Sequence, residues 1–383
     1  MDQFPWPAAE VPSGDELAAW AFWNAVPSCG PRTFAKLVTE FGSAERAARE
    51  VGPASWPGLS PRARAFVANC PDPVAYGRQE LAHARRLGAR AVPGTSHEYP
   101  PLLRKTHDPP ILLYVRGDRD LADSKWIAVV GTRAATAYGL SVARRLARDL
   151  AGAGVGVVSG LARGIDSAAH LGAMDAGGPT CGVLGSGLGC AQPPGRRNLI
   201  RKVERLGCVV SSFPMGFPAG KYTFPARNRI ISGMALGCVV VEAGERSGSF
   251  ITVDLALSEG RAVFAVPGDI GRPTSRGTNR LIGEGATVVT GADTILEELG
   301  ISAASLGGGN GTVLGAACQP RGGADGSLWD EAVLEAVTVN TAVDDILAAV
   351  SLPLPTVLST LSRLEIAGKV RRGHGYRFTR SGC

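Results

Sequence analysis

The stretch IAVVGTRAATAYGLSVARRLARDLAGAGVGVVSGLARGID, residues 127–166, decides the fold. It runs from a short apolar segment through a glycine-bearing loop into a helical stretch, and then reaches a second apolar segment. This order recurs along the chain, and the apolar segments are Ile127–Val130, Val155–Val158, Cys181–Leu184, Cys208–Val210, Cys238–Val241, Ala262–Val266 and Ala286–Val289. Apolar strands that alternate with helices are typical of a parallel sheet covered on both faces. The sequence therefore predicts an α/β fold with a Rossmann-like, doubly wound, mainly parallel sheet.

Smaller domains are predicted on either side of this core. Helical spacing with a break at Pro27–Pro31 predicts a small helical domain over residues 1–70, which either grips a DNA backbone through its turn or only packs. A proline-rich connector, 71–110, leads into the core domain, 111–303. A glycine-rich linker, 304–326, precedes residues 327–383, where three helices and a basic hairpin predict a winged helix. Such a domain either contacts DNA or contacts protein.

Composition limits the classes of protein. The chain has 383 residues, 45% of them hydrophobic, which excludes a wholly disordered chain, and its net charge of +6 favours an anionic partner. Eight scattered cysteines form no C-x-x-C pair and no zinc spacing, so we expect a reducing compartment and no metal. Met1–Glu10 does not resemble a secretory signal, and no long apolar stretch follows it. We therefore expect a cytoplasmic protein with no membrane association.

Arginines follow the predicted strands in six separate loops. In a parallel sheet these loops meet at one edge, where helix N-termini attract anions. Repeated cations there oppose the helix dipoles, which suggests a ligand with repeated phosphates. Alternatively, Glu242, Glu245, Asp166 and Asp269 pair with these arginines internally. The loops contain Arg133, Arg163, Arg196 with Arg197, Arg227 with Arg229, Arg246 and Arg276.

Aromatic residues favour single strands over duplex as the ligand. Phe213, Phe217, Tyr222 and Phe224 lie in one long loop with Lys221, and unpaired bases stack on exposed rings. No dinucleotide-binding G-x-G-x-x-G follows the first strand and no Walker loop is present, so no cofactor is predicted. Asp166 and His170 lie one helical turn apart and form either an acid–base pair or two structural side chains.

These motifs resemble the DNA-processing protein A family, also called DprA or Smf. The resemblance covers most of the chain and rests on the segments Asp108–Pro110, Leu113–Gly117, Val130–Arg133, Ser159–Asp166, Phe224–Ile231, Glu242–Ser249 and Ser275–Ile282. It implies a non-enzymatic mediator, a homodimer that binds single-stranded DNA, loads the RecA recombinase in natural transformation (competence) and displaces single-strand-binding protein. By motif, it implies that Arg133 with Gly131 and Thr132 holds a phosphate, that Ser159, Gly160 and Gly164 form a second amide cradle, and that Arg227 and Asn228 line the groove.

Two departures from the family pattern stand out. Gln192–Arg196 replaces a segment that commonly carries a phosphate-binding lysine, whose charge Arg196 or Arg197 would supply. Ser211-Ser212 replaces the common Ser-Glu.

Two alternative functions are a nucleoside-monophosphate phosphoribohydrolase, whose P-G-G-x-G-T-x-x-E signature is absent, and a winged-helix transcription regulator.

The full prediction separates binding from structural residues. Asp166 and Glu242 are predicted to be structural, and no catalytic residue is predicted. The predicted nucleic-acid-binding residues are Gly131, Thr132, Arg133, Ser159, Gly160, Arg163, Gly164, Arg196, Arg197, Lys221, Phe224, Arg227, Asn228, Arg229, Ser247, Gly248, Ser249 and Arg276.

Overall fold

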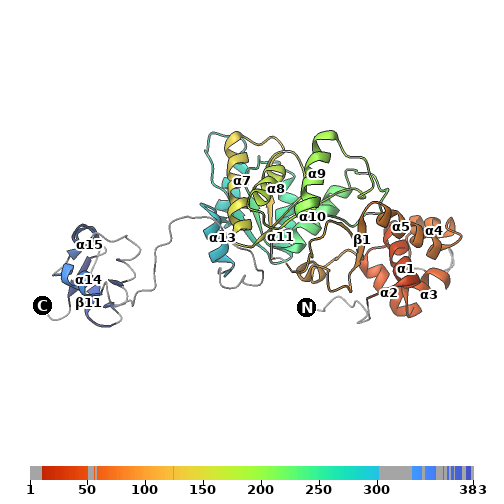
Figure 1. The fold of residues 1–383 in the computed structure, drawn as a ribbon, viewed down its shortest axis with the longest axis horizontal. Coiled ribbons are helices and arrows are strands. Elements are labelled where there is room, and N and C mark those ends of the chain that lie inside the picture. The colour runs from red at the N-terminus through yellow and green to blue at the C-terminus, as the bar shows by residue number, and fades with distance from the viewer. Residues whose placement is uncertain are drawn as a thin grey trace. The chain divides into compact units, whose positions relative to one another are not determined.

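The computed structural model divides the chain into two compact units, residues 1–308 and 309–383 (Figure 1). The predicted glycine-rich linker, 304–326, lies outside the described residues. Those described are 11–50, 56, 58–123, 125–301, 330–338, 341–350, 357, 360–361, 364–365, 367–372 and 377–380.

A sheet with the strand order β1-β2-β6-β5-β4-β3-β7-β8-β9 forms the centre of the first unit. Its parallel strands coincide with the predicted apolar segments. They are β3 (Trp126–Val130), β4 (Gly156–Ser159), β5 (Thr180–Val183), β6 (Cys208–Ser211), β7 (Ala235–Val240), β8 (Ala262–Ala265) and β9 (Thr287–Val288). At one edge, β1 (Ala89–Pro93) and β2 (Leu112–Arg116) run antiparallel. The predicted α/β fold with a mainly parallel sheet is confirmed.

Helices cover both faces of this sheet because successive strand residues point to opposite sides. Ile127 and Val129 of β3 pack with α7 (Ala137–Gly152), α8 (Ile165–Asp175) and α13 (Ala292–Glu298). Ala128 and Val130 pack instead with α10 (Thr223–Met234), α11 (Ser249–Ser258) and α12 (Arg276–Gly283). Helix α9 (Pro194–Leu206) packs over β5 and β6. Strands buried on both faces explain why the sequence shows apolar runs rather than alternation.

The winding of the chain reverses at β3. From β3 the strands proceed to β4, β5 and β6 on one side, and β7 then returns to the other side of β3, with Val130 opposite Val240. In open α/β sheets, ligands bind beyond the carboxyl ends of the strands at such a reversal. The loops that follow β3, β4 and β7 therefore enclose the candidate site.

The N-terminal helices pack through aromatic side chains. They are α1 (Gly14–Ala25), α2 (Pro31–Phe41), α3 (Ala44–Glu50) and α4 (Pro61–Ala68), with Phe22, Trp23 and Phe34 fully buried. Within 71–110, where the sequence predicts a connector, lie the helix α5 (Pro73–Arg86), which packs on α1, the edge strand β1 and the short α6 (Pro101–Arg104). Helix α5 begins at a proline because Asp72 accepts a hydrogen bond from the Ala75 amide and Pro fits the first helical position.

The second unit contains α14 (Asp330–Ala336), α15 (Val343–Val350) and a small antiparallel sheet. In this sheet β12 (Arg377–Arg380) pairs with both β10 (Thr341–Ala342) and β11 (Val370–Arg372). The predicted third helix falls only partly within the described residues, where Val357, Leu361 and Leu364 are buried beside Phe378. Their spacing is that of one helical face.

Candidate nucleic-acid interface

Two glycine-bearing loops form the base of the site. Gly164 precedes α8 at φ +90°, and a Cβ atom there would lie 2.3 Å from the Thr132 carbonyl oxygen, so only glycine fits. Gly131 is restricted in a similar way, because a Cβ atom at this position would lie 2.6 Å from the Ile165 side chain. The Thr132 amide donates to the Glu242 carbonyl oxygen at 2.8 Å. The loops after β3, β4 and β7 are therefore locked together at the carboxyl edge of the sheet.

A buried carboxylate and a buried guanidinium lie above these loops. Asp166 accepts hydrogen bonds from the Gly160 and Ala162 amides at 3.2 and 3.3 Å and lies 3.9 Å from the Arg227 guanidinium. Burial raises the pKa of Asp166, whereas Arg227 lowers it. Burial lowers the pKa of Arg227, while Asp166 raises it. Each charge therefore depends on the other to remain ionised inside the protein.

Two further arginines share this environment. Burial lowers the pKa of Arg196, Arg133 lowers it further, and both arginines also lower the pKa of Arg227. The Phe224 ring lies 5.6 Å from the Arg133 guanidinium and 5.9 Å from that of Arg227, within cation–π range. Arg133, Arg196 and Arg227, from three different segments, are therefore close enough to influence one another's charge, and of the three Arg227 is buried and paired with Asp166.

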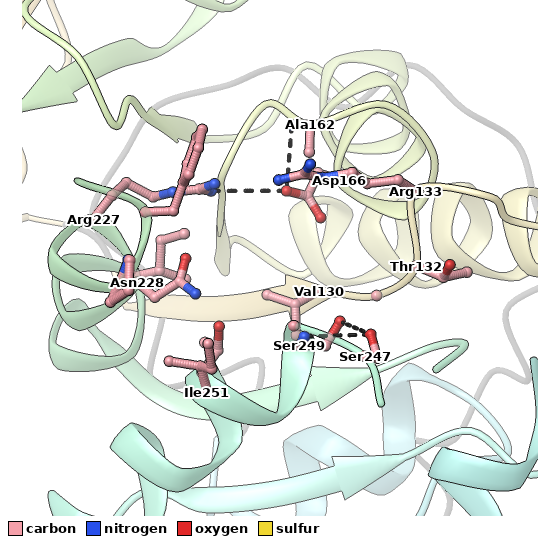
Figure 2. A pocket seen from close by; sticks show the side chains of 16 residues that line it. Val130, Thr132, Arg133, Ala162, Asp166, Arg227, Asn228, Ser247, Ser249 and Ile251 are labelled. Carbon is pink, nitrogen blue, oxygen red and sulfur yellow. Dashed lines mark hydrogen bonds and ion pairs between the residues drawn. The ribbon is translucent and has the colours of Figure 1, made fainter. Parts of the chain in front are cut away.

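Arg133, Asp166, Phe224 and Arg227 line a pocket of about 430 Å³. Figure 2 shows Arg227 and Arg133 reaching toward Asp166 along one wall, with Asn228, Ser247 and Ser249 on the other. The Ser247 and Ser249 hydroxyl groups are 3.0 Å apart at the start of α11, where the Ser249 amide donates to the Ser247 hydroxyl at 3.3 Å. Cations and hydroxyl groups are among the groups that hold phosphate oxygens.

Glu242 fixes the start of α7. Its carboxylate accepts from the Thr136 amide at 2.9 Å and from the Thr136 hydroxyl at 2.5 Å, and it is almost fully buried. It forms no ion pair with an arginine among those found in the described residues. These contacts support the structural role predicted for Glu242.

The structure brings together only part of the predicted binding set. Ser159 is fully buried and donates to the Val129 carbonyl oxygen, and Gly160 packs against Arg227. Arg163 and Arg196 line an adjacent groove between α8 and α9. The predicted binding residues that line the pocket itself are Gly131, Thr132, Arg133, Phe224, Arg227, Asn228, Ser247, Gly248 and Ser249. Their role in binding stays a prediction.

Other predicted residues lie outside the pocket. Arg229 pairs with Asp108 at 2.5 Å, and Arg276 lies 3.6 Å from Glu245. Arg197 donates to the Gln192 carbonyl oxygen, and Lys221 lies over the Tyr222 ring. Internal pairing, the alternative interpretation of the loop arginines, therefore applies to Arg229 and Arg276 and to Arg227 with Asp166.

Asp166 and His170 do not contact each other through any hydrogen bond found in the described residues. The His170 Nδ1 atom lies 2.7 Å from the Thr180 hydroxyl, and burial lowers the pKa of this histidine to about 3. A ring that stays neutral and buried is poorly suited to acid–base exchange with a substrate. These contacts support the structural alternative for both residues.

The sequence analysis did not identify several residues that line the pocket. Pro225 and Ile231 come from α10, and Ile251 and Thr252 come from the first turns of α11. Helical spacing gives a usable signal for Pro225, Ile231 and Thr252, because each lies three positions from Asn228 or Ser249 and so shares its face of the helix.

The described residues give no sign of a metal centre or a membrane span. No cluster of three or more His, Cys, Asp or Glu side chains there is arranged to hold a metal ion. Nor does that part of the chain contain a helix both long and apolar enough to cross a bilayer. Burial raises the pKa of the Cys29 and Cys238 thiols to about 12.

Comparison with known families shows similarity in both units. Residues 91–300 match the family described as DNA recombination-mediator protein A, and residues 324–376 match the DprA winged helix domain. The predicted C-terminal winged helix is thereby confirmed. The chain is 46% identical over 209 residues to Protein Smf of Escherichia coli (strain K12), and this match spans 54% of the chain and 56% of that protein.

Two solved structures share the fold. DNA processing protein A (DprA) from Streptococcus pneumoniae superposes with a TM-score of 0.58 at 31% identity, covering 75% of this chain and 98% of that one. DNA processing protein A from Helicobacter pylori, solved to describe its single-stranded DNA binding mode, has a TM-score of 0.50 at 28% identity. The latter match covers 55% of this chain and 95% of the Helicobacter pylori chain.

Proposed function

Since this chain belongs to the DNA recombination-mediator protein A family (DprA, Smf), we propose that it binds single-stranded DNA in the pocket beside β3 and β7. The observation that carries the proposal is the pair of guanidinium groups, Arg133 and Arg227, that line this pocket beside Asp166, with Arg196 in the adjacent groove. Arg133 is exposed and Arg196 is half-buried, and neither has an ion pair among those found in the described residues, so a phosphate can pair with both. Arg196 supplies the charge of the missing family lysine.

The dimensions of the pocket favour single strands over duplex. A volume of about 430 Å³ is within the range of pockets that enclose one small ligand or nucleotide. Paired bases stay stacked inside a duplex and reach such a pocket only after unstacking. The Phe224 ring and the Arg133 guanidinium offer a surface for an unpaired base.

Several finer features of the function belong to the same proposal. We propose that the protein acts without catalysis in the cytoplasm, as a homodimer, in the recombination step of natural transformation. The bound strand would pass to the RecA recombinase while single-strand-binding protein is displaced. The 28% identical relative from Helicobacter pylori, studied for its single-stranded DNA binding, supports the choice of ligand.

A salt titration tests the choice of ligand. Homopolymer single strands are expected to bind more tightly than duplex of the same length. With three phosphate contacts, the logarithm of the binding constant should fall against the logarithm of salt concentration with a slope of about −2. Fluorescence anisotropy with labelled strands measures both quantities. Equal affinity for duplex, or a binding constant that does not change with salt concentration, would contradict the proposal.

Arg133→Ala should weaken binding by about 10- to 100-fold, because a charge-assisted hydrogen bond contributes about 1.5–3 kcal/mol. The loss should be the same for every strand sequence, since phosphate contacts do not depend on base identity. The salt slope should also become shallower by about 0.7. Arg148→Ala is the matched control, because Arg148 is an exposed arginine on α7 that pairs with Asp149. A loss confined to one sequence would argue against a phosphate contact.

A further inference from the structure

A second groove lies on the opposite side of α10 from the pocket. It has a volume of about 440 Å³ and lies between the turn that joins α1 to α2 and the loop after β6. The Asn24 side-chain amide donates to the Ser212 carbonyl oxygen at 2.9 Å, which fixes the N-terminal helices against this loop. The groove is thus a built feature of the junction between the helical region and the sheet.

Two stacked aromatic rings form one wall of this groove. The Phe213 and Phe217 ring centroids are 5.3 Å apart, their planes are 16° from parallel, and both rings line the groove. Phe217 is 43% exposed, so the stack is not closed by protein on its outer side. Unpaired bases add to such a stack with any sequence, which is how many proteins hold single strands.

Cations lie at the rim of the same groove. Arg62 of α4 and Arg229 of α10 both line the groove, and both are exposed. Arg229 is paired with Asp108, but both side chains are about half exposed, at 54% and 40%, and an exposed pair contributes little stability. A phosphate can therefore compete for Arg229 at small cost. Aromatic rings beside guanidinium groups match the bases and the backbone of a single strand.

Helix α10 separates the groove from the pocket by its own width, about 10–12 Å. Pro225, Arg227 and Asn228 face the pocket, whereas Ala226 and Arg229 line the groove. Tyr222, at the start of this helix, is 78% exposed with Lys221 over its ring. One strand can therefore cross the first turn of α10 from the pocket to the groove, passing an aromatic residue and a lysine.

We propose that the groove between the α1–α2 turn and the Phe213–Phe217 stack is a second subsite for the same DNA strand. Bases of the segment that leaves the pocket stack on Phe217, and its phosphates face Arg62 and Arg229. This inference rests on the proposed function, because it extends the strand bound in the pocket. It also gives the N-terminal helical hairpin a role, as the outer wall of the strand's path.

Strand length provides the test. Strands of about two or three nucleotides are too short to cross the width of α10 and fill only the pocket, whereas strands of about 20 nucleotides reach both cavities. For the full-length protein, Phe217→Ala is expected to weaken binding of the long strand by about 5- to 100-fold and to leave the short strand unchanged. Arg62→Ala should act in the same direction. Arg64→Ala, on the same helix but outside the lining of the groove, is the matched control.

Photocrosslinking of the unmodified protein gives an independent readout. Long strands that carry iodouracil should crosslink to the peptide containing Phe213 and Phe217, and short strands should not. Unchanged affinity of Phe217→Ala for long strands, together with no crosslink in this peptide, would overturn the second subsite, as would an equal loss for both lengths. If no strand binds the unmodified protein at all, the proposed function fails as well. A groove that instead holds a partner peptide would give normal long-strand binding in every variant, which also overturns the inference.

Discussion

Asp166→Ala is expected to lower the free energy of unfolding by about 3–5 kcal/mol, the cost of leaving one member of a buried ion pair without its partner. The Asp166 and Arg227 side chains are only 9% and 8% exposed. Without the carboxylate, Arg227 stays buried near Arg196 and Arg133, both of which lower its pKa. The Gly160 and Ala162 amides also lose their acceptor.

Urea unfolding of three variants measures this effect. Asp175→Ala is the matched control, because Asp175 lies on the same helix but forms an exposed pair with Arg144, and such pairs contribute less than about 1 kcal/mol. Asp166→Asn keeps an acceptor for the loop amides and should fall between the two. Equal losses for Asp166→Ala and Asp175→Ala would show that burial of the pair does not matter here.

The strands were predictable from the sequence because each one carries its own local signal. Every parallel strand is an apolar run followed by a glycine-bearing loop, and burial on both faces makes such runs continuous. Within 71–110 the prolines suggested a connector and concealed α5. Pro73 occupies the first position of that helix, where the missing amide hydrogen has no consequence. A proline therefore marks the start of this helix and does not exclude one.

The candidate site was harder to predict because it depends on helix phase and on distant partners. Arg227 and Arg229 are two positions apart, which at 3.6 residues per turn places them on nearly opposite sides of α10. One enters the pocket and the other pairs with Asp108, 121 positions away. Arg276 likewise meets Glu245 only through the fold. The sequence shows which loops carry cations, and the packing determines which cations remain available to a ligand.

Acid is expected to destabilise the protein through His170 by about 1.4 kcal/mol per pH unit below about pH 6.5. The ring is fully buried, its Nδ1 atom is bonded to the Thr180 hydroxyl, and its Nε2 atom has no hydrogen-bond partner among the described residues. Burial lowers the pKa of His170 from 6.5 to about 3. Between these two values the unfolded chain binds a proton that the folded chain does not, so the free energy of unfolding falls as the pH falls.

The matched variant for this histidine is His170→Gln, whose side-chain amide fills a similar volume and bonds to Thr180 without titrating. Between about pH 6.5 and about pH 5 the unmodified protein should lose about 1.6 kcal/mol more free energy of unfolding than this variant. Other titrating groups contribute equally to both proteins and cancel in the comparison. Parallel stability curves would show that the ring is hydrated or that the folded chain binds the proton, and both outcomes contradict a neutral, buried His170. A steeper loss in the unmodified protein would show that His170 stays neutral in the folded chain, where its hydrogen bond to Thr180 connects α8 to β5.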